Sequence, residues 1–268
     1  MVLVPSLINP PNILDLDDES SLAAALARAG RRVLLLDWGP AADRVELGVG
    51  DHVEQLLVPL IEALGESAAL VGYCLGGTMA IAAANLTAVE RVATLAAPWH
   101  FAAYPRESRT ALGEVWNGSR AAATGFGRLP MEVLQAIFWA LDPDRTVSKF
   151  AHFAALDPAS AAARRFVTLE DWANDGEPVP LPAARELVED LFGRDLAGSG
   201  AWLIGGRAMR DTLAVPVLHF TAADDRIAPA ATAPAGPHCA IPAGHVGMIV
   251  GQHARTKLHA PLAKWLGD

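Results

Sequence analysis

The chain has 268 residues, of which 52% are hydrophobic, with a mean hydropathy of +0.26 and a formal net charge of −9 at pH 7. This length fits one large domain with a sizeable core, and the negative charge argues against nucleic acid as a partner, because such binding depends on clustered Lys and Arg. The two cysteines, Cys74 and Cys239, do not form the disulfide framework of a small secreted protein, so we expect a cytoplasmic protein.

Short apolar runs alternate with helical patterns, as is typical of an α/β fold with a mostly parallel sheet flanked by helices. The predicted strands are 2–4, 32–37, 68–71, 92–96, 215–221 and 238–241, and the predicted helices 22–29, 53–64 and 255–265. Residues 67–89 carry no charged side chain. A turn with three glycines divides this run into a buried strand and a buried helix, so we expect no transmembrane segment.

Residues 100–213 show a different pattern, with amphipathic helical stretches such as 130–141 and 182–192 and no convincing strand. We expect this segment to form a helical cap over the carboxyl edge of the sheet, where open α/β sheets bind ligands. The predicted organisation is therefore a core made of residues 1–99 and 214–268 that is interrupted by a cap made of residues 100–213.

The segment 70–80 predicts the reactive centre. An apolar run reaches the turn Gly72-Tyr-Cys-Leu-Gly-Gly77 and continues into an Ala-rich helix, which is the layout of a nucleophile elbow. Gly72 and Gly76 allow neighbouring backbone to approach the turn closely. Cys74 is the predicted nucleophile in place of the more usual serine, which favours thioester chemistry. Cys239 is interpreted as a small hydrophobic residue, the ordinary role of a lone cysteine.

In an α/β-hydrolase fold the acid and the histidine follow the nucleophile in that order. Asp224 and Asp225 follow the predicted strand 215–221, and the residues alone leave both open as the acid. His245 lies in a glycine-flanked loop after the last predicted strand and is the best candidate for the base.

The other histidines receive structural interpretations, except His100, which lies just past a predicted strand end near the site. We expect His219 and His238 to be packed or hydrogen-bonded. Four histidines are expected on helix surfaces: His52, His152, His253 and His259. Because there is no metal-ligand spacing and no Gly-rich nucleotide loop, no metal and no cofactor are predicted.

Taken together, these residues resemble the catalytic domain of polyhydroxyalkanoate synthases, most closely the shorter type that works with a second subunit. The similarity extends from about Leu3 to Trp265. It is carried by the segments Val4-Pro5 to Ile8-Asn9, Asp37-Trp38-Gly39, Gly72-x-Cys74-x-Gly76-Gly77, Leu169-Glu170-Asp171-Trp172 and Gly244-His245-Val246-Gly247-Met248.

The resemblance implies an α/β-hydrolase fold and acyl transfer from a 3-hydroxyacyl-CoA thioester to Cys74, followed by ester formation with the hydroxyl of a growing chain. The family's Asp-His-x-x-Pro loop matches residues 225–229, which selects Asp225 as the acid. We then expect His245 to deprotonate the thiol. The expected oxyanion donors are the backbone N–H groups of Leu75 and Asn9.

Substrate contacts and partners are further expectations. The candidate substrate-binding residues are Ile8, Tyr73, His100 and Trp172. The expected substrate is an acyl-CoA or an ester, and the candidate partners are a polyester granule and an activating subunit. The strand 32–37 is expected at the sheet edge, where an apolar strand invites pairing with another chain, so we also expect self-association.

The chain departs from the family pattern in the cap and acid loops. Arg226 stands where the family has a histidine, His100 stands where it has an aspartate, and the segment 229–238 is short. These departures bear on polymerisation more than on the acyl-enzyme step. Two alternatives therefore stay open: a thioesterase or polyester esterase with the same triad, and a non-catalytic granule-associated subunit.

Overall fold

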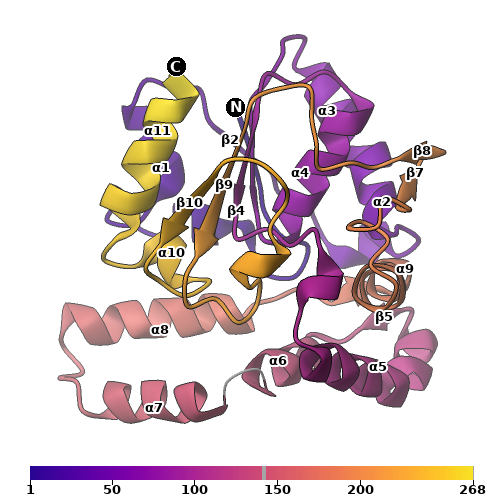
Figure 1. Cartoon of the computed structure of the whole chain (residues 1–268). Helices are drawn as coiled ribbons and strands as arrows, with labels where there is room; N and C mark the ends of the chain where they lie inside the picture. Colours follow the sequence, from indigo (N-terminus) through magenta and orange to yellow (C-terminus); the bar gives the residue numbers. More distant parts are fainter. Residues whose placement is uncertain (141–142, 268) are drawn as a thin grey trace.

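The structure is a computed structural model that describes residues 1–140 and 143–267, without the side chains of residues 137–140 and 143–146. Its central sheet has six strands in the order β10-β9-β4-β3-β1-β2 (Figure 1). These strands are β1 (Val2–Val4), β2 (Leu34–Leu35), β3 (Leu70–Tyr73), β4 (Val92–Leu95), β9 (Val217–Ala222) and β10 (His238–Ile241). All neighbouring pairs are parallel, so their carboxyl ends meet at one edge. The predicted α/β fold class is confirmed.

Helices cover both faces of the sheet (Figure 1). One face carries α1 (Leu22–Arg28), α10 (Gly247–Val250), η7 (Arg255–His259) and α11 (Ala260–Gly267). The other carries α2 (Val49–Asp51), η3 (His52–Leu57), α3 (Val58–Ala63) and α4 (Leu75–Leu86). Short helical turns are η1 (Pro11–Asp15), η2 (Ala41–Arg44), η4 (Phe101–Ala103) and η6 (Ala230–Thr232).

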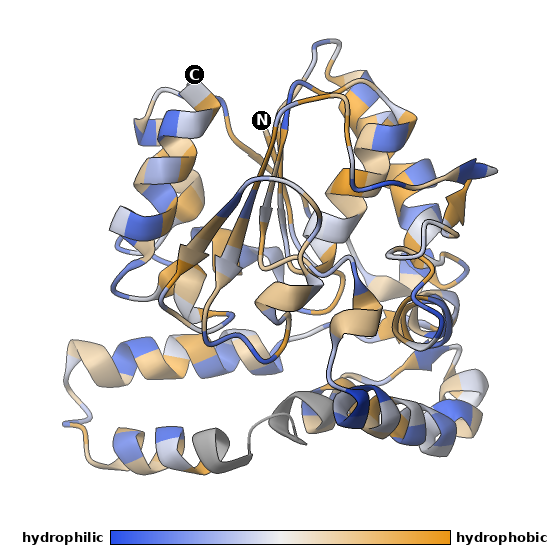
Figure 2. Ribbon diagram, in the orientation of Figure 1, coloured by the Kyte–Doolittle hydropathy of each residue, from blue (hydrophilic) through white to orange (hydrophobic). Residues whose placement is uncertain are grey.

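The sheet divides the hydrophobic core into two layers. Side chains alternate along a strand, so Val2 and Val4 pack toward α4 while Leu3 packs toward α1 and α11. Hydrophobic residues follow the central strands, and hydrophilic residues lie on the outer turns of the helices (Figure 2). In the described part of the chain, no helix is both long and apolar enough to cross a bilayer.

The chain between β4 and β9 is mostly helical, and α5 to α8 lie beyond the carboxyl edge of the sheet (Figure 1). The helices are α5 (Arg106–Phe126), α6 (Met131–Ala140), α7 (Pro143–Ala154), α8 (Ala161–Asn174), α9 (Leu181–Arg185) and η5 (Glu186–Gly193). From α9 onward the segment connects the two parts, because α9 and β7 contact α2 while η5 packs against α5. Leu141, the expected end of a helix, lies outside the described residues.

The expectation that this segment has no strand is wrong. Antiparallel pairs join β5 (Arg128–Leu129) to β6 (Val179–Pro180) and β7 (Leu203–Ile204) to β8 (Arg207–Ala208). Each strand has two residues, which is too short for alternation to be visible in the sequence.

Two histidines that were expected on helix surfaces are buried. His52 has Nδ1 2.6 Å from the Gly48 carbonyl oxygen and Nε2 2.9 Å from Nη1 of Arg44. His259 has Nε2 3.2 Å from the carbonyl oxygen of Ile249. The surface prediction is wrong for both: His259 contacts α10, and His52 lies between Arg44 of η2 and the backbone at the start of its own helical segment.

Candidate active site

Cys74 occupies a strained turn between β3 and α4. Its backbone angles are φ 55° and ψ −130°, a positive φ that is uncommon for a residue other than glycine. A Cβ on Gly72 would lie 2.4 Å from Cα of Gly77, and one on Gly76 would lie 2.2 Å from the carbonyl oxygen of Val4. Glycine is therefore required at both positions for the turn to close, and the turn holds a half-buried Cys74 at the carboxyl edge of the sheet.

Asp225 and His245 form a buried pair from the loops after β9 and β10. His245 Nδ1 lies 2.6 Å from Asp225 Oδ2. Asp225 Oδ1 accepts the backbone N–H groups of Ile227 and Ala228, each at 2.8 Å. These bonds fix the carboxylate in place, and the carboxylate in turn fixes the ring. Asp224 is exposed and lines the neighbouring cavity, so the structure brings Asp225 and not Asp224 to the histidine.

The surroundings of His245 favour its protonated form. Burial lowers the pKa of His245, but the charges of Asp225 and Cys74 and hydrogen bonds with both side chains outweigh burial, so its pKa is raised. Nδ1 faces Asp225, which leaves Nε2 for the thiol. The ring is therefore able to hold the proton that it accepts from the attacking thiol.

Tyr73 contacts the loop that carries His245. Its hydroxyl donates to the backbone oxygen of His245 at 3.3 Å, and the two rings lie with centroids 5.1 Å apart. Burial raises the pKa of Tyr73, helped by the charges of Cys74 and Asp225. Its hydroxyl therefore stays protonated and available as a donor.

The two expected oxyanion donors, Leu75 and Asn9, come from different segments of the chain. Leu75 is the first residue of α4, so its N–H has no partner within the helix. Asn9 lines the cavity beside Cys74, and its side-chain Nδ2 donates to the carbonyl oxygen of Ala173 at 3.3 Å.

Three hydrogen bonds tie the loop that carries Asn9 to the end of α8. They run from Asn9 Nδ2 to Ala173 O at 3.3 Å, from Trp172 Nε1 to Pro10 O at 2.9 Å, and from Glu177 N to Ile8 O at 3.0 Å. Trp172 is almost fully buried. It lies in the wall of the larger cavity, and its indole N–H also holds this loop in place.

Two cavities meet at Cys74. The larger has a volume of about 510 Å³ and is lined in part by charged or titratable side chains: Lys149, Arg165, Glu170, Asp224, Arg226 and His245. The smaller has a volume of about 110 Å³ and is apolar. Ile8, Cys74 and Ile227 line both cavities, Tyr73 and Trp172 the larger, and Leu75 the smaller.

His100 is not brought to these cavities. Its Nε2 lies 3.1 Å from Oδ2 of Asp211, and its backbone N–H donates to the carbonyl oxygen of Thr232 at 3.0 Å. Among the described residues that line the two cavities it is absent. Its position after β4 suggested a place in the site, but the contact with Asp211, which is distant in the sequence, turns the side chain elsewhere.

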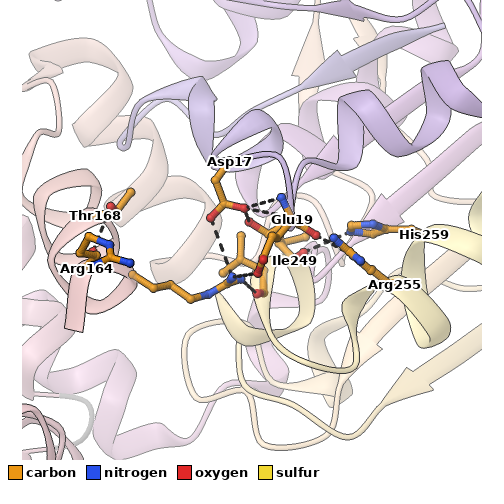
Figure 3. A network of polar contacts seen from close by, with 10 residues as sticks. Asp17, Glu19, Arg164, Thr168, Ile249, Arg255 and His259 are labelled. Carbon is orange, nitrogen blue, oxygen red and sulfur yellow. Dashed lines mark hydrogen bonds and ion pairs between the residues drawn. The ribbon is translucent and has the colours of Figure 1, made fainter. Parts of the chain in front are cut away.

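A polar network fastens α8 to the core at the rim of the larger cavity (Figure 3). Arg165 Nη1 lies 3.6 Å from Glu19 Oε2 and 3.9 Å from Asp17 Oδ2, and the same guanidinium donates to the carbonyl oxygen of Val250. Arg255 Nε donates to the backbone oxygen of Glu19 at 2.7 Å. Exposed ion pairs are individually weak. Together, however, these contacts join three segments at one point: α8 of the cap, the loop before α1, and the chain after β10.

Similarity to known proteins was found at two levels, and no family model matches the chain. In sequence, it is 26% identical to the poly(3-hydroxyalkanoate) polymerase subunit PhaC of Haloferax mediterranei, covering 100% of this chain and 58% of that protein. It is also 26% identical to the protein of the same name from Synechocystis, covering 100% of this chain and 77% of that protein. The chain is therefore similar along its whole length to proteins named PhaC.

The matches cover all of this chain but only part of some of the matched proteins. The chain spans about three fifths of the length of its relatives from Haloferax mediterranei and Haloarcula marismortui, at 58% and 60%. The residues that carry the site fall inside the matched region, because the matches cover all of this chain.

Solved structures show the same fold. A monoacylglycerol lipase from Paleococcus ferrophilus has a TM-score of 0.56 at 18% identity, covering 99% of this chain and 92% of that one. A non-heme bromoperoxidase BpoC from Mycobacterium tuberculosis has a TM-score of 0.57 at 18% identity, covering 99% and 91%. At this identity the likeness concerns fold alone, and the fold is that of the α/β-hydrolases.

Two features of the site were not foreseen from the sequence. The N–H groups of Ile227 and Ala228 that bind Asp225 are backbone atoms, for which side-chain patterns give no signal. The smaller cavity is built by residues from the loop after β1, η4, α5, α6 and η5, which only the folded chain brings together.

Proposed function

We propose that the chain is a polyhydroxyalkanoate synthase-like acyltransferase that takes the acyl group of a 3-hydroxyacyl-CoA thioester onto Cys74. The observation that carries this proposal is the elbow cysteine in the same cavity wall as His245, whose Nδ1 lies 2.6 Å from the buried Asp225 carboxylate. Similarity to the PhaC subunits supports the choice of substrate class.

In the first half-reaction, His245 Nε2 takes the thiol proton and Cys74 Sγ attacks the thioester carbonyl carbon. The N–H groups of Leu75 and Asn9 stabilise the charge that develops on the carbonyl oxygen. The bond between the acyl carbon and the CoA sulfur then breaks, and the CoA thiolate takes the proton from His245. One thioester is exchanged for another, so the step is nearly balanced in free energy.

In the second half-reaction, His245 removes the proton from the hydroxyl of an incoming 3-hydroxyacyl group or growing chain. The hydroxyl oxygen attacks the acyl carbon on Cys74, an ester bond forms, and the bond to Sγ breaks. The Cys74 sulfur recovers its proton from the ring. Asp225 keeps Nε2 in the correct state in both halves by holding Nδ1.

A hydrolase is the second candidate, because water in place of the hydroxyl gives a free hydroxy acid by the same steps. The large cavity with charged side chains is the observation that favours it, since such a cavity admits water. Proteins of the same fold include a lipase and several esterases and hydrolases by name. The acceptor, and not the nucleophile, separates the two candidates.

We further propose that the protein acts in the cytoplasm or on a polyester granule, where CoA thioesters occur and a thiol stays reduced. The reaction as written uses no metal and no cofactor besides the CoA substrate. The edge strand β2 has the two residues Leu34–Leu35 with one neighbour, β1, and it offers an unpaired edge to a second copy. An activating subunit is the alternative partner, and light scattering of the purified protein with and without substrate separates the two.

The test is incubation with 3-hydroxybutyryl-CoA while CoA release and the acyl product are both followed. The Cys74→Ala variant is expected to lose nearly all CoA release, whereas the matched variant Cys239→Ala is expected to retain it. Oligomer or polymer as product supports the acyltransferase, and free hydroxy acid supports the hydrolase. CoA release that persists in Cys74→Ala would contradict both, and absence of turnover on any thioester or ester would favour the non-catalytic subunit.

A further inference from the structure

The smaller of the two cavities has a hydrocarbon wall. It holds about 110 Å³ between α5, α6 and η5, and its wall includes Leu112, Trp116, Leu134, Ala184, Val188 and Phe192. No charged side chain is among the described residues that line it. Tyr104, one of its few polar residues, donates its hydroxyl to the carbonyl oxygen of Ile227 at 2.8 Å, and the Trp116 Nε1–H is taken up by Glu189 at 2.9 Å.

Cys74 stands where this cavity meets the larger one, with Ile8 and Ile227 shared by both walls. A thioester that reacts at Sγ has two ends, the CoA and the acyl chain. The CoA end is bulky and carries phosphates, so neither the volume nor the uncharged wall of the small cavity suits it. The large cavity has about 510 Å³, and charged side chains of both signs lie in its wall, with Lys149 paired to Glu170, so it offers a polar lining as well as more room. By this reasoning the CoA end lies in the large cavity and the acyl chain in the small one.

We propose, resting on the function proposed above, that this apolar cavity binds the side chain at C3 of the acyl group and selects medium-length chains over a methyl group. An apolar protein cavity of about 150 Å³ stays dry and binds a six-carbon ring. A cavity of 110 Å³ on the same scale holds a side chain of roughly three to five carbons. The preferred acyl groups are then 3-hydroxyhexanoyl to 3-hydroxyoctanoyl.

Filling this cavity also explains why chain length would affect the rate. Each methylene group that leaves water for an apolar wall is worth about fourfold in an equilibrium constant. A methyl side chain, as in 3-hydroxybutyryl-CoA, leaves most of the space empty. One extra methylene group in a hydrophobic pocket can change kcat/KM by about tenfold or more. We therefore expect kcat/KM to be at least about tenfold higher for the longer substrate.

The test narrows the cavity without touching the triad. Val188 is almost fully buried in the cavity wall, and Val188→Phe adds a ring where the side chain would lie. Val167→Phe on α8 is the matched control, because Val167 is 45% exposed and is not among the described residues that line either cavity. Thermal unfolding of both variants shows that the fold is kept, and Ala184→Leu is a second, smaller filling if Val188→Phe does not fold.

The measured quantity is kcat/KM for CoA release from 3-hydroxyoctanoyl-CoA and from 3-hydroxybutyryl-CoA. The unmodified protein and Val167→Phe should prefer the longer substrate by at least about tenfold, and Val188→Phe should lower that ratio to about twofold or less by losing the longer substrate. Equal losses for both substrates, or no preference in the unmodified protein, would overturn the assignment. A growing polyester chain as the occupant would instead shorten the product in Val188→Phe with both rates unchanged, which also overturns it.

A second readout separates this assignment from the proposed function. Acylation of Cys74 by p-nitrophenyl butanoate and octanoate, followed by intact-protein mass, needs no CoA and no acceptor. A preference for octanoate that disappears in Val188→Phe supports the acyl cavity even where no CoA thioester is turned over, in which case the acyltransferase proposal alone fails. Turnover of both CoA thioesters with identical rates in all three proteins would leave the acyltransferase standing and overturn the cavity.

Discussion

His245 Nδ1 lies 2.6 Å from Asp225 Oδ2, and the two residues are 9% and 6% exposed, although they come from separate loops of the sheet. Although the pair is buried, both carboxylate oxygens of Asp225 are hydrogen-bonded, because two backbone N–H groups donate to the oxygen that does not face His245. Burial lowers the pKa of His245, and the charge of Asp225 is the largest of the contributions that raise it in spite of burial.

Removing this charge should make Cys74 less reactive. Asp225→Asn takes away the main group that raises the pKa of His245, so the ring loses its proton at lower pH and is a weaker acceptor for the thiol proton. We expect the rate of alkylation of Cys74 by iodoacetamide at neutral pH to fall and turnover to drop by at least about 100-fold. Asp224→Asn is the control and should change turnover by less than about threefold; equal effects of the two variants would contradict the assignment of the acid.

The elbow should tolerate no side chain at Gly76. A Cβ there would lie 2.2 Å from the carbonyl oxygen of Val4 and 2.4 Å from that of Pro5, which are backbone atoms that cannot move aside without shifting β1. We expect Gly76→Ala to lower the free energy of unfolding by about 3 kcal/mol, measured by urea denaturation. Gly113→Ala in α5, where a Cβ meets nothing within 4 Å, should be neutral or stabilising by up to about 1 kcal/mol. A Gly76→Ala protein as stable as the Gly113→Ala protein would refute the packing described for the elbow.

Buried histidines should make the fold sensitive to mild acid. The pKa of His219 is lowered to about 4, mainly by burial; the charge of His238 acts in the same direction, whereas the hydrogen bond with the Ala235 carbonyl and the charge of Asp211 oppose it. The unfolded chain binds this proton near pH 6.5 and the folded chain does not, so stability falls as the pH falls between about 6.5 and 4. Burial lowers the pKa of His52 and His259 in the same direction.

Urea denaturation at pH 7 and at pH 5 measures this effect. The His219→Gln variant should show a smaller loss of stability between the two pH values than the unmodified protein does, whatever its stability at pH 7. His152→Gln, which replaces an exposed histidine of α7, should leave the loss unchanged. An identical pH dependence in all three proteins would show that His219 is protonated alike in both states.

Trp172 should act on turnover through the loop that it holds. Trp172→Phe keeps the ring in the cavity wall but removes the N–H that donates to the Pro10 oxygen at 2.9 Å. We expect kcat to fall by about tenfold with a smaller change in KM, because a loosened Asn9 loop weakens stabilisation of the transition state more than binding of the substrate. Trp202→Phe, which removes a buried indole bond of 2.7 Å to Glu186 away from the elbow, should affect stability and not kcat. A change in KM alone for Trp172→Phe would make Trp172 a substrate contact only.

Much of the site was accessible from the sequence because its chemistry sits on short segments with strong local signals. The strand before Cys74 ends in a glycine turn, and His245 stands in a glycine-flanked loop, so both positions could be assigned from pattern and order. The choice of Asp225 over Asp224 was not decided by residue type, because adjacent aspartates share the same local context. It followed from the resemblance, and in the structure two backbone donors and the histidine ring all face Asp225.

The rest depended on contacts that the order of residue types does not specify. His100 turns toward Asp211, which is distant in the sequence. His52 is enclosed by Arg44 and the Gly48 carbonyl, which are close in the sequence but meet the ring only through the fold of this segment. The apolar cavity is formed by faces of α5, α6 and η5 that are ordinary amphipathic helices in the sequence, and its connection to Cys74 exists only in the folded chain.

The most direct test of the central claim is the identity of the acylated residue. After brief incubation with a 3-hydroxyacyl-CoA and acid quench, peptide mass spectrometry should find one acyl group on the peptide that carries Cys74, and Asp225→Asn should delay its appearance. A Cys74→Ala protein should carry no acyl group. An acyl group on any other residue, or CoA released with Cys74 unmodified and free of acyl at every time point, would contradict the account.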